Sequence, residues 1–463
     1  MGRHALGSTT VALSLAGLLV ALPCPAVLEY QLLKSFTGAD GSGPMSGVIE
    51  ANDGALYGAT PAGGTNRGGT VYRIQKDGTG YAVLHHFSTN WLDEYFPAGP
   101  AGRLLQATDG MLYGTTASWA PNNIFKMNTD GSGFDSKTVN LFDDAVPLPG
   151  LIEGSDGALY GLGPSGFFNL NKNLAVVTNR GSGCFSAWVG FEFIEGDDGF
   201  LYAAGGNDGC GGSCFNGFID KLSQDYTSFE IVKWFFCNDA PVAGMVPTGS
   251  LLDGGDGKLY GLGYKYESVT TNYLTSGIVY RLEKTGSNFV VLAQFDATQG
   301  IPSGRLVEGR DGRLYGARKP CLFEWWNSCA SGSSTIFRVN KDGSGLTDVA
   351  TVGGNIAGLT LGSDGAIYGT TADGGQFGYG SIFKLSWPLV ITRYERNGTN
   401  ALLRWSGIPN WPYRIQTRMN LTDAADVWVT LGGTNITDQD GTFQLTFPEP
   451  TGGSAKFYRI AHP

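Results

Sequence analysis

The sequence predicts an all-β protein: a seven-bladed β-propeller closed by an N-terminal strand and followed by a small β-sandwich. Glycine accounts for 72 of the 463 residues, 12% are aromatic and only 16% are charged, a composition typical of short strands joined by tight turns. The pattern Asp-Gly-x-Leu/Ile-Tyr recurs seven times between residues 53 and 368. Its spacing of about 52 residues falls in the range of propeller blades.

Each repeat is expected to hold four antiparallel strands. In the first repeat, strand patterns cover residues 47–51, 55–60, 70–75 and 81–87. An Asp-Gly pair separates the first two patterns, and Asp-Gly is a strong hairpin signal because both central residues of a type I′ turn need positive φ. We interpret the Asp of each pair as a turn former rather than a calcium ligand, because an EF-hand loop needs alternating acids that end in Glu.

The two ends of the array predict how it closes. The seventh repeat reaches its third strand at 382–385 and then meets Trp387-Pro388, so its fourth strand is missing. The segment 30–36 (YQLLKSF) matches the fourth strand of the first repeat at 81–87 (YAVLHHF). The N-terminal segment is therefore expected to complete the last blade and to remove an open strand edge.

These motifs resemble the bacterial GloVer (Gloeo/Verruco) tandem-repeat family. The best matches are residues 53–74 (DGALYGATPAGGTNRGGTVYRI) and 364–385 (DGAIYGTTADGGQFGYGSIFKL), and the resemblance covers residues 30–386. The third repeat departs from the pattern by a very short loop at 164–166, and the fourth has Ala203 in place of Gly. The resemblance implies an exported or surface-associated propeller and no established activity.

Three domains are expected: a signal peptide at 1–26, the propeller at 27–386 and an immunoglobulin/fibronectin-like sandwich at 387–463. Residues 1–26 combine Arg3 and His4, an apolar stretch at 12–21 and a cleavage site ending at Ala26, which predicts a secreted or cell-surface protein. Strands of the last domain are expected at 389–394, 401–405, 413–417, 428–431, 443–447 and 457–460. Its core is expected around Trp405, Tyr413 and Tyr458.

Charge and motifs exclude several classes of function. The net charge is −10 without a Lys/Arg cluster, which disfavours nucleic acid because phosphates need a basic face. The sequence has no stretch long and apolar enough to span a membrane. It has no nucleophile elbow, phosphate loop or histidine metal signature, so no cofactor, metal or catalytic residue is predicted. His85 and His86 fall on an outer strand, where a solvated or packed role is expected.

Six cysteines follow the predicted signal peptide, an even number that predicts disulfides in an exported protein. They are Cys184, Cys210, Cys214, Cys237, Cys321 and Cys329. The last two lie in one insertion of the sixth repeat and are expected to pair. The other four surround the fourth repeat, where Cys184 and Cys237 bridging to Cys210 and Cys214 is favoured and a Cys210–Cys214 bridge is the alternative. A zinc site is disfavoured because no histidine is near.

The second and fourth connections of each blade share one face of a propeller, and they hold most of the length variation. These loops cover 91–101, 180–189, 205–217, 237–248, 264–277 and 319–334. Their aromatic residues are the candidate ligand-binding residues, because Trp and Tyr anchor many interfaces: Trp91, Tyr95, Trp119, Tyr264, Tyr266, Trp325 and Trp326. The alternative is that they pack the loops onto the blades.

The leading functional hypothesis is a binding or scaffold protein that presents this loop face to an extracellular glycan or protein. The alternative is a polysaccharide lyase or hydrolase with its site at the mouth of the central channel. Ionisable side chains that converge on the channel mouth would favour the enzyme, whereas Gly and apolar residues would favour the scaffold. Strand starts with the pattern Pro-x-Gly, at 247–249 and 302–304, favour the scaffold, and Arg103 and Arg305 are the exceptions to inspect first. The sequence predicts no oligomeric state.

Overall fold

A computed structural model describes sixteen segments of the chain. They are residues 28–88, 99–100, 102–116, 123–138, 150–163, 166–181, 192–207, 216–236, 245–269, 272–296, 298–319, 332–397, 399–418, 429–431, 441–448 and 457–461. Within them the regular elements are strands, and no described helix has the length and apolarity needed to cross a bilayer. Two compact units divide the chain, one containing Gln31–Glu308 and Leu314–Lys384, the other containing Leu385–Pro463.

The first repeat folds as a four-stranded antiparallel sheet in the order β2-β3-β4-β5. Its strands are β2 (Ile49–Glu50), β3 (Leu56–Thr60), β4 (Arg67–Ile74) and β5 (Ala82–Ser88). Register pairs Tyr57 with Arg73 and Ile49 with Tyr57, so the repeat Tyr lies in the second strand. The four predicted strands of this repeat are present within a few residues of their expected positions.

In the next five repeats the four repeat strands follow the same order, and the fifth sheet has one additional strand, Met245–Pro247. Their strands are β6 (Leu105–Gln106), β7 (Leu112–Thr115), β8 (Asn123–Met127) and β9 (Asp135–Thr138); β10 (Ile152–Glu153), β11 (Leu159–Gly163), β12 (Gly166–Leu170) and β13 (Val176–Gly181); β14 (Ile194–Glu195), β15 (Leu201–Asn207), β16 (Asn216–Leu222) and β17 (Phe229–Phe235); β18 (Met245–Pro247), β19 (Leu252–Asp253), β20 (Lys258–Val269), β21 (Asn272–Glu283) and β22 (Val290–Phe295); and β23 (Ile301–Glu308), β24 (Leu314–Lys319), β25 (Ser333–Val339) and β26 (Thr347–Gly353). Each is antiparallel throughout.

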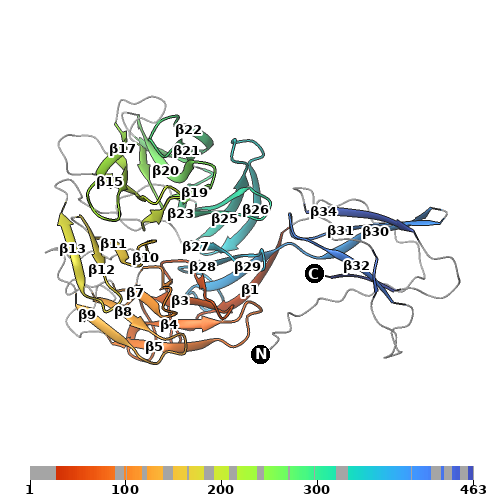
Figure 1. Ribbon diagram of the computed structural model, residues 1–463, viewed down its shortest axis with the longest axis horizontal. Coiled ribbons are helices and arrows are strands. Elements are labelled where there is room, and N and C mark those ends of the chain that lie inside the picture. Colours follow the sequence, from red (N-terminus) through yellow and green to blue (C-terminus); the bar gives the residue numbers. More distant parts are fainter. Residues whose placement is uncertain are drawn as a thin grey trace. The chain divides into compact units, whose positions relative to one another are not determined.

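The last repeat takes its fourth strand from the N-terminus. The sheet order is β1-β29-β28-β27, with β27 (Ile356–Leu361), β28 (Ile367–Thr371), β29 (Ser381–Ser386) and β1 (Glu29–Ser35). The predicted pairing of the N-terminal segment with the last repeat is therefore present. Figure 1 shows the seven sheets of this unit following one another in chain order around a common centre, a propeller-like arrangement.

One predicted loop is a hairpin. Residues 264–277 are expected from the sequence to form a variable loop, but β20 and β21 each extend to twelve residues and pair as far as Val269 with Asn272. The prediction was wrong because sequence length between repeats does not distinguish a loop from two longer strands. Residues 264–269 and 272–275 are rich in Tyr, Thr and Val, residue types that favour paired strands.

Two hydrogen bonds that one carboxylate accepts explain the repeat motif Asp-Gly-x-Leu-Tyr. In the first sheet, Asp53 Oδ1 accepts from the backbone N of Ala55 at 3.0 Å, and Oδ2 accepts from the Tyr57 hydroxyl at 2.7 Å. Gly54 follows with φ 79°, a conformation that glycine adopts without steric cost. The Asp side chain thus stabilises its own turn and also positions the buried Tyr. This agrees with the interpretation of the Asp as a turn former.

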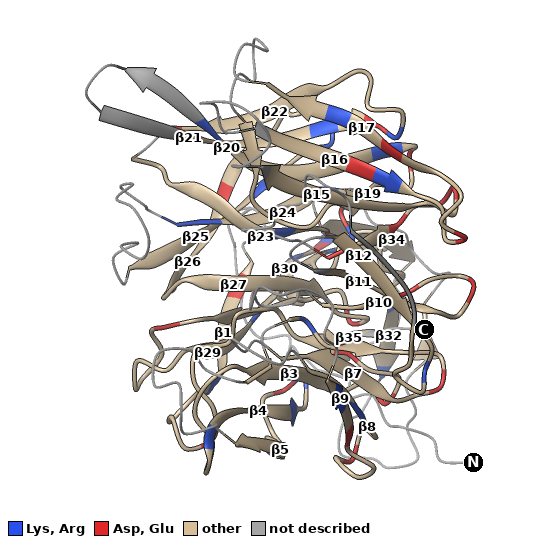
Figure 2. Ribbon diagram, turned by 90° about the vertical axis from the view of Figure 1, so that its left-hand side faces the viewer, with Lys and Arg blue, Asp and Glu red and all other residues tan. Residues whose placement is uncertain are grey.

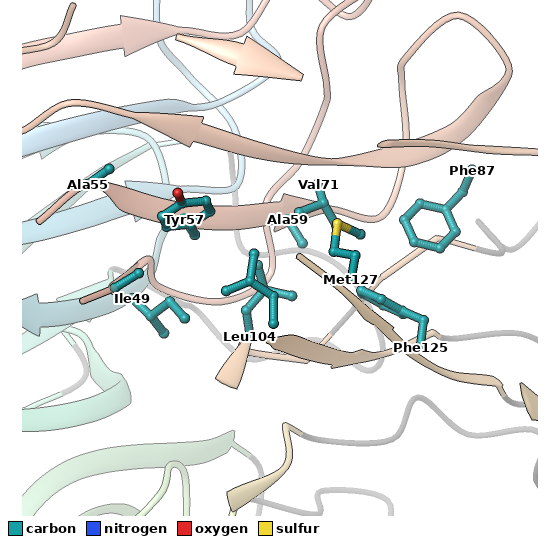
Figure 3. Close-up of a cluster of buried hydrophobic side chains, with 11 residues drawn as sticks. Ile49, Ala55, Tyr57, Ala59, Val71, Phe87, Leu104, Phe125 and Met127 are labelled. Carbon is teal, nitrogen blue, oxygen red and sulfur yellow. The ribbon is translucent and has the colours of Figure 1, made fainter. Parts of the chain in front are cut away.

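The glycine after each Tyr admits an aromatic ring from the third strand. A Cβ atom at Gly369 would lie 2.2 Å from Cζ of Phe383, and one at Gly261 would lie 2.3 Å from the Tyr280 ring. The rings lie between neighbouring sheets, together with the aliphatic side chains of the strands. Figure 3 shows one such cluster, in which Ile49 and Tyr57 of the first sheet meet residues such as Phe125 of the second.

The second unit holds two three-stranded antiparallel sheets. One is β30 (Val390–Asn397), β31 (Asn400–Ser406) and β34 (Thr442–Pro448); the other is β33 (Val429–Thr430), β32 (Arg414–Arg418) and β35 (Phe457–Ala461). Trp405, Tyr413 and Tyr458 are 0%, 1% and 4% exposed and belong to one cluster. The three residues predicted to form the core are therefore buried together.

Candidate functional site

The residue six positions before each repeat Asp lies within the first strand of its repeat or two residues before it, and we call these seven residues the axial positions. They are Gly47, Arg103, Gly150, Glu192, Ser250, Arg305 and Gly358. Figure 1 shows β10, β19, β23 and β27, four of the strands that contain or closely follow these positions, around the centre of the unit. Gly47 and Gly358 belong to the first and last sheets, and a Cβ at Gly47 would lie 3.2 Å from the Gly358 carbonyl carbon.

Three axial positions carry charged side chains, and these three converge. Arg103, Glu192 and Arg305 come from the second, fourth and sixth sheets. Arg305 Nη1 lies 3.8 Å from Glu192 Oε2, and the two side chains are 24% and 14% exposed. Side chains from three alternate sheets thus meet, where the four other axial positions hold Gly or Ser.

The electrostatics of this cluster are unbalanced. Burial first, and then the positive charge of Arg305, lower the pKa of Arg103 to about 10, while Glu192 acts in the opposite direction. Two guanidiniums therefore share one carboxylate and leave an excess of one positive charge. Repulsion between the two guanidiniums is weakly screened in a medium of low dielectric constant. Binding of an anion would therefore lower the electrostatic energy of the cluster.

Each guanidinium also has one buried hydrogen-bond donor, its Nε, without an acceptor in the described part of the chain. Among the described residues, neither Nε of Arg103 nor Nε of Arg305 has an acceptor. A buried donor without an acceptor costs about 1–3 kcal/mol. Nε of Arg318 and Nε of Arg404 also have no acceptor among the described residues, so it is the excess positive charge together with these donors that distinguishes the axial cluster.

Gly150 provides the space that Glu192 occupies. A Cβ atom at Gly150 would lie 2.5 Å from Glu192 Oε1 and 2.8 Å from the carbonyl oxygen of Arg103. A side chain at this position would displace the carboxylate. The small residues at the other axial positions therefore define where the charged side chains can lie.

The opposite end of the first strands holds a second polar network, and it is regular. In the fourth sheet, Glu195 accepts from the backbone N of Ser155 in the third sheet at 2.9 Å and from Gln224 Nε2 at 2.6 Å. The same carboxylate or amide position links sheets through Glu50, Gln106, Glu153 and Asp253. Figure 2 shows acidic and basic residues at the turns between the strands.

The charges of this turn network are matched. Burial raises the pKa of Glu153, but hydrogen bonds from Lys172 and Thr108 outweigh it and leave the pKa below its usual value. Burial lowers the pKa of Lys284, but hydrogen bonds to Asp197 and Asp253 outweigh it and raise the pKa. Glu153 and Lys284 face opposite charges, and Glu195 is held by an amide and a backbone N–H, so this network has a structural role.

The fourth sheet carries one buried carboxyl that departs from the repeat. Asp220 in β16 pairs with Ala203, where other sheets place an aromatic ring opposite glycine. Asp220 is 2% exposed, and neither carboxyl oxygen has a hydrogen-bond donor among the described residues. Burial raises its pKa well above the ordinary value.

Most of the predicted site residues lie outside the described segments. These are Trp91, Tyr95, Trp119, Trp325 and Trp326, together with all six candidate disulfide cysteines, Cys184, Cys210, Cys214, Cys237, Cys321 and Cys329, and the predicted signal peptide. Tyr264 and Tyr266 lie in β20, where Tyr264 is half-buried and pairs with Gly277. The predicted aromatic set therefore stays a prediction.

The histidines have packed or hydrogen-bonded roles. The His85 ring stacks on Phe134 with centroids 3.8 Å apart, and His86 Nδ1 accepts from the backbone N of Thr65 at 3.2 Å. Within the described segments, no three His, Cys, Asp or Glu residues are grouped as metal ligands would be.

Sequence reasoning singled out Arg103 and Arg305 but missed Glu192. A signal was present: Glu192 lies six residues before its repeat Asp, as the two arginines do. Aligning the seven repeats on this position would have found all three charged residues. That they meet in space depends on how the sheets are arranged around the centre, which the alignment alone does not give.

Comparison with solved structures supports a propeller-like fold. Virginiamycin B lyase from Staphylococcus aureus is 15% identical, with a TM-score of 0.50 over 77% of this chain and 98% of the lyase. A catalytically inactive variant of that lyase with quinupristin gives 15% identity and a TM-score of 0.50 over 77% and 99%. PorZ of Porphyromonas gingivalis is 12% identical, with a TM-score of 0.49 over 89% of this chain and 56% of PorZ. At these identities the similarity shows the fold alone.

Sequence comparison gives one family. No curated protein matches the chain. A family model described as the Gloeobacter/Verrucomicrobia repeat matches residues 16–184, and this match supports the repeat family predicted from the Asp-Gly-x-Leu/Ile-Tyr motif.

Proposed function

We propose that this chain is an exported binding protein, a closed seven-bladed propeller that takes its ligand at the axial positions. The observation that carries the proposal is the convergence of Arg103, Glu192 and Arg305, with an excess positive charge and two unpaired Nε donors. Charges of the turn network, such as those of Glu153 and Lys284, have partners of opposite charge. An unmatched cluster at the centre is what a ligand site requires.

Closure of the ring is supported by links between the last sheet and the first. The Thr370 hydroxyl donates to the Ser46 carbonyl oxygen at 2.8 Å, and the backbone N of Ser363 donates to Glu50 at 2.7 Å. The same kind of link joins the first sheet to the second, where Asn52 N donates to Gln106 at 2.7 Å. A ring without an open edge would hold the axial side chains in fixed positions.

The loop face remains part of the proposal. The axial positions lie in or just before the first strands, after the fourth connections of the preceding repeats, so they lie at the end of the propeller that carries the long loops. The aromatic residues and disulfides predicted there would surround a ligand held at the centre. The proposed partner is an extracellular glycan or protein, and the C-terminal unit is proposed to be an immunoglobulin/fibronectin-like carrier.

Hydrolysis of a polysaccharide is the weaker candidate. Glycoside hydrolases use a pair of carboxylates that flank the bond to be cleaved, but Glu192 is the one acid among the seven axial residues. A lyase would need a base such as His or Tyr close to the substrate, and none of these seven residues is of that type. The axial residues therefore favour binding over catalysis.

The test is a binding screen of the full chain against extracellular glycans and proteins. A ligand found in the screen should lose at least tenfold in affinity when Arg305→Ala is introduced. Lys137→Ala is the matched control, because Lys137 lies on the exposed strand β9 and donates to a backbone carbonyl oxygen. A ligand that binds both variants equally well would place binding elsewhere and overturn the axial proposal.

A further inference from the structure

We propose that the axial cluster binds a carboxylate, and that its ligand is a uronate unit of an acidic glycan. This inference rests on the proposed function and names the chemical class of the ligand. The supporting observation is that Arg103 and Arg305 face one shared carboxylate, Glu192, and each keeps an Nε donor without an acceptor among the described residues. A second carboxylate would balance the charge and supply the missing acceptors.

The geometry of guanidinium groups favours this class of anion. Arginine presents Nε and Nη donors in a planar fork that matches the two oxygens of a carboxylate. Glu192 Oε2 lies 3.8 Å from Arg305 Nη1, a distance longer than a hydrogen bond. The fork of Arg305 therefore remains available for a ligand carboxylate, and Nε of Arg103 is a further donor without an acceptor among the described residues.

Size and charge favour one acidic sugar over a highly charged polymer. The cluster has an excess of one positive charge, whereas the whole chain has a net charge of −10, so a dense polyanion would be repelled at long range. Gly47 and Gly358 pack against each other, with a Cβ atom at Gly47 3.2 Å from the Gly358 carbonyl carbon, and a Cβ atom at Gly150 would lie 2.5 Å from Glu192 Oε1, so the space beside the two arginines suits a group of limited size. A protein partner would need an interface of about 1,000 Å² or more, which three axial side chains do not supply.

Glu192 would act as a positioning residue. It neutralises one guanidinium, so that the cluster holds one anion and not two. Its own carboxylate lies over Gly150, where a Cβ atom would lie 2.5 Å from Oε1. Removing the charge of Glu192 should therefore strengthen carboxylate binding, whereas removing either arginine should weaken it.

The experiment measures binding of the full chain to a galacturonate oligosaccharide by calorimetry. The same oligosaccharide with its carboxyl groups methyl-esterified is the neutral control, and a peptide with a free C-terminal carboxylate tests the other source of this anion. We expect the oligosaccharide to bind, esterification to weaken binding at least tenfold, and the peptide to bind at least tenfold more weakly than the oligosaccharide.

Variants decide whether the arginines hold the carboxylate. Arg103→Gln and Arg305→Gln should each weaken binding of the galacturonate oligosaccharide at least tenfold, and Glu192→Gln should strengthen it severalfold. Arg305→Lys should not restore full affinity, because an ammonium lacks the fork. Thermal unfolding of each variant shows that it is folded.

The outcomes separate this inference from the function on which it rests. If the acidic and esterified oligosaccharides bind equally well, and Arg305→Gln abolishes the binding of both, the carboxylate assignment is overturned. The axial positions would still be the binding site. Preferential binding of the peptide would overturn the glycan. Absence of galacturonate binding would overturn the inference, and the proposed function would then be decided by the screen with Arg305→Ala.

Discussion

The two ends of the first strands differ in how they use charge. At the turn end, an acid or amide three residues before the repeat Asp links neighbouring sheets in most repeats, as Glu195 does with Ser155 and Gln224. At the axial end, Arg103, Glu192 and Arg305 meet once, with an excess of charge and unpaired Nε donors. Both groups of residues lie in or just before the same short strands, so the fold does not account for the difference.

The difference suggests different roles for the two ends: the turn end stabilises the fold, and the axial end binds a ligand. An interaction repeated around the unit can be shared among many sheets, and each copy has its partners within the protein. A cluster that occurs once and leaves donors unsatisfied costs stability, and proteins tolerate such costs mainly at functional sites. The predictions below test the turn end as structural and the axial end as a site for a ligand.

The largest effect is expected from the buried Tyr at the turn end. Tyr260 is 0% exposed, and its hydroxyl donates to Asp256 at 2.8 Å. Tyr260→Ala removes a ring from a closely packed region and should lower the free energy of unfolding by about 3–5 kcal/mol. Tyr260→Phe keeps the ring and should cost about 1 kcal/mol. Urea unfolding at neutral pH measures both, and equal costs would mean that the hydroxyl, not the ring, supports the turn end.

Much of the turn end was predictable because each of its positions occurs seven times. The Asp-Gly turn and the buried Tyr repeat in every unit, so chance matches are averaged out. The linking role of Glu195 was not predicted, although an acid or amide recurs at its position in most repeats. Its hydrogen bond joins residues 40 positions apart in different sheets, and the spacing alone gives no sign of that pairing.

The axial end was predictable only in part because it has no repetition. Arg103 and Arg305 stood out against the small residues at the starts of other strands. Glu192 did not, since one acid in one repeat resembles a solvated residue. The extended hairpin β20–β21 shows the same limit, because a segment found in one repeat was taken for a loop.

Asp220 tests whether every departure from the repeat serves a ligand. It is a buried carboxyl without a described donor, and it lies within a sheet rather than at an axial position. Replacing it by the apolar Asp220→Leu should raise the free energy of unfolding at pH 7 by about 1–3 kcal/mol. No change in ligand affinity is expected. A loss of affinity would extend the functional region beyond the axial positions.

The stability gained by Asp220→Leu should be larger at high pH than at low pH. Burial raises the pKa of folded Asp220 above its unfolded value, so the folded wild-type protein binds more protons between the two pKa values and its stability falls as pH rises through that range. The advantage of Asp220→Leu over wild type should therefore shrink as pH falls towards about 4, the pKa of an unfolded aspartate. Thermal unfolding between pH 4 and 8 checks this, and an advantage independent of pH would show that apolar packing, not the charge, is responsible.

A smaller effect is expected from one link of the turn network. Lys284 is 10% exposed and lies 2.6 Å from Asp253, which is 15% exposed. Lys284→Met should lower the free energy of unfolding by about 1–2 kcal/mol, because it leaves Asp253 without its cation. Lys258→Met is the control, since Lys258 is 32% exposed and 3.5 Å from Asp256, and exposed pairs contribute about 0–1 kcal/mol. Equal effects in urea unfolding would show that the turn network is no stronger than surface charge.

The smallest effect compares two glutamates three residues apart in the same repeat. Glu192→Ala removes the counter-charge of Arg103 and Arg305, whereas Glu195→Ala removes a link between sheets, and each should cost about 1 kcal/mol at low ionic strength. Sodium sulfate should restore most of the loss in Glu192→Ala beyond its effect on wild type, because the anion can take the place of the missing carboxylate between two guanidiniums. It should not do so in Glu195→Ala, where the lost partners include a neutral amide and a backbone N–H. If sulfate raises the unfolding temperature of both variants equally, the axial end has no special affinity for anions, and the contrast between the two ends would reflect only their different packing.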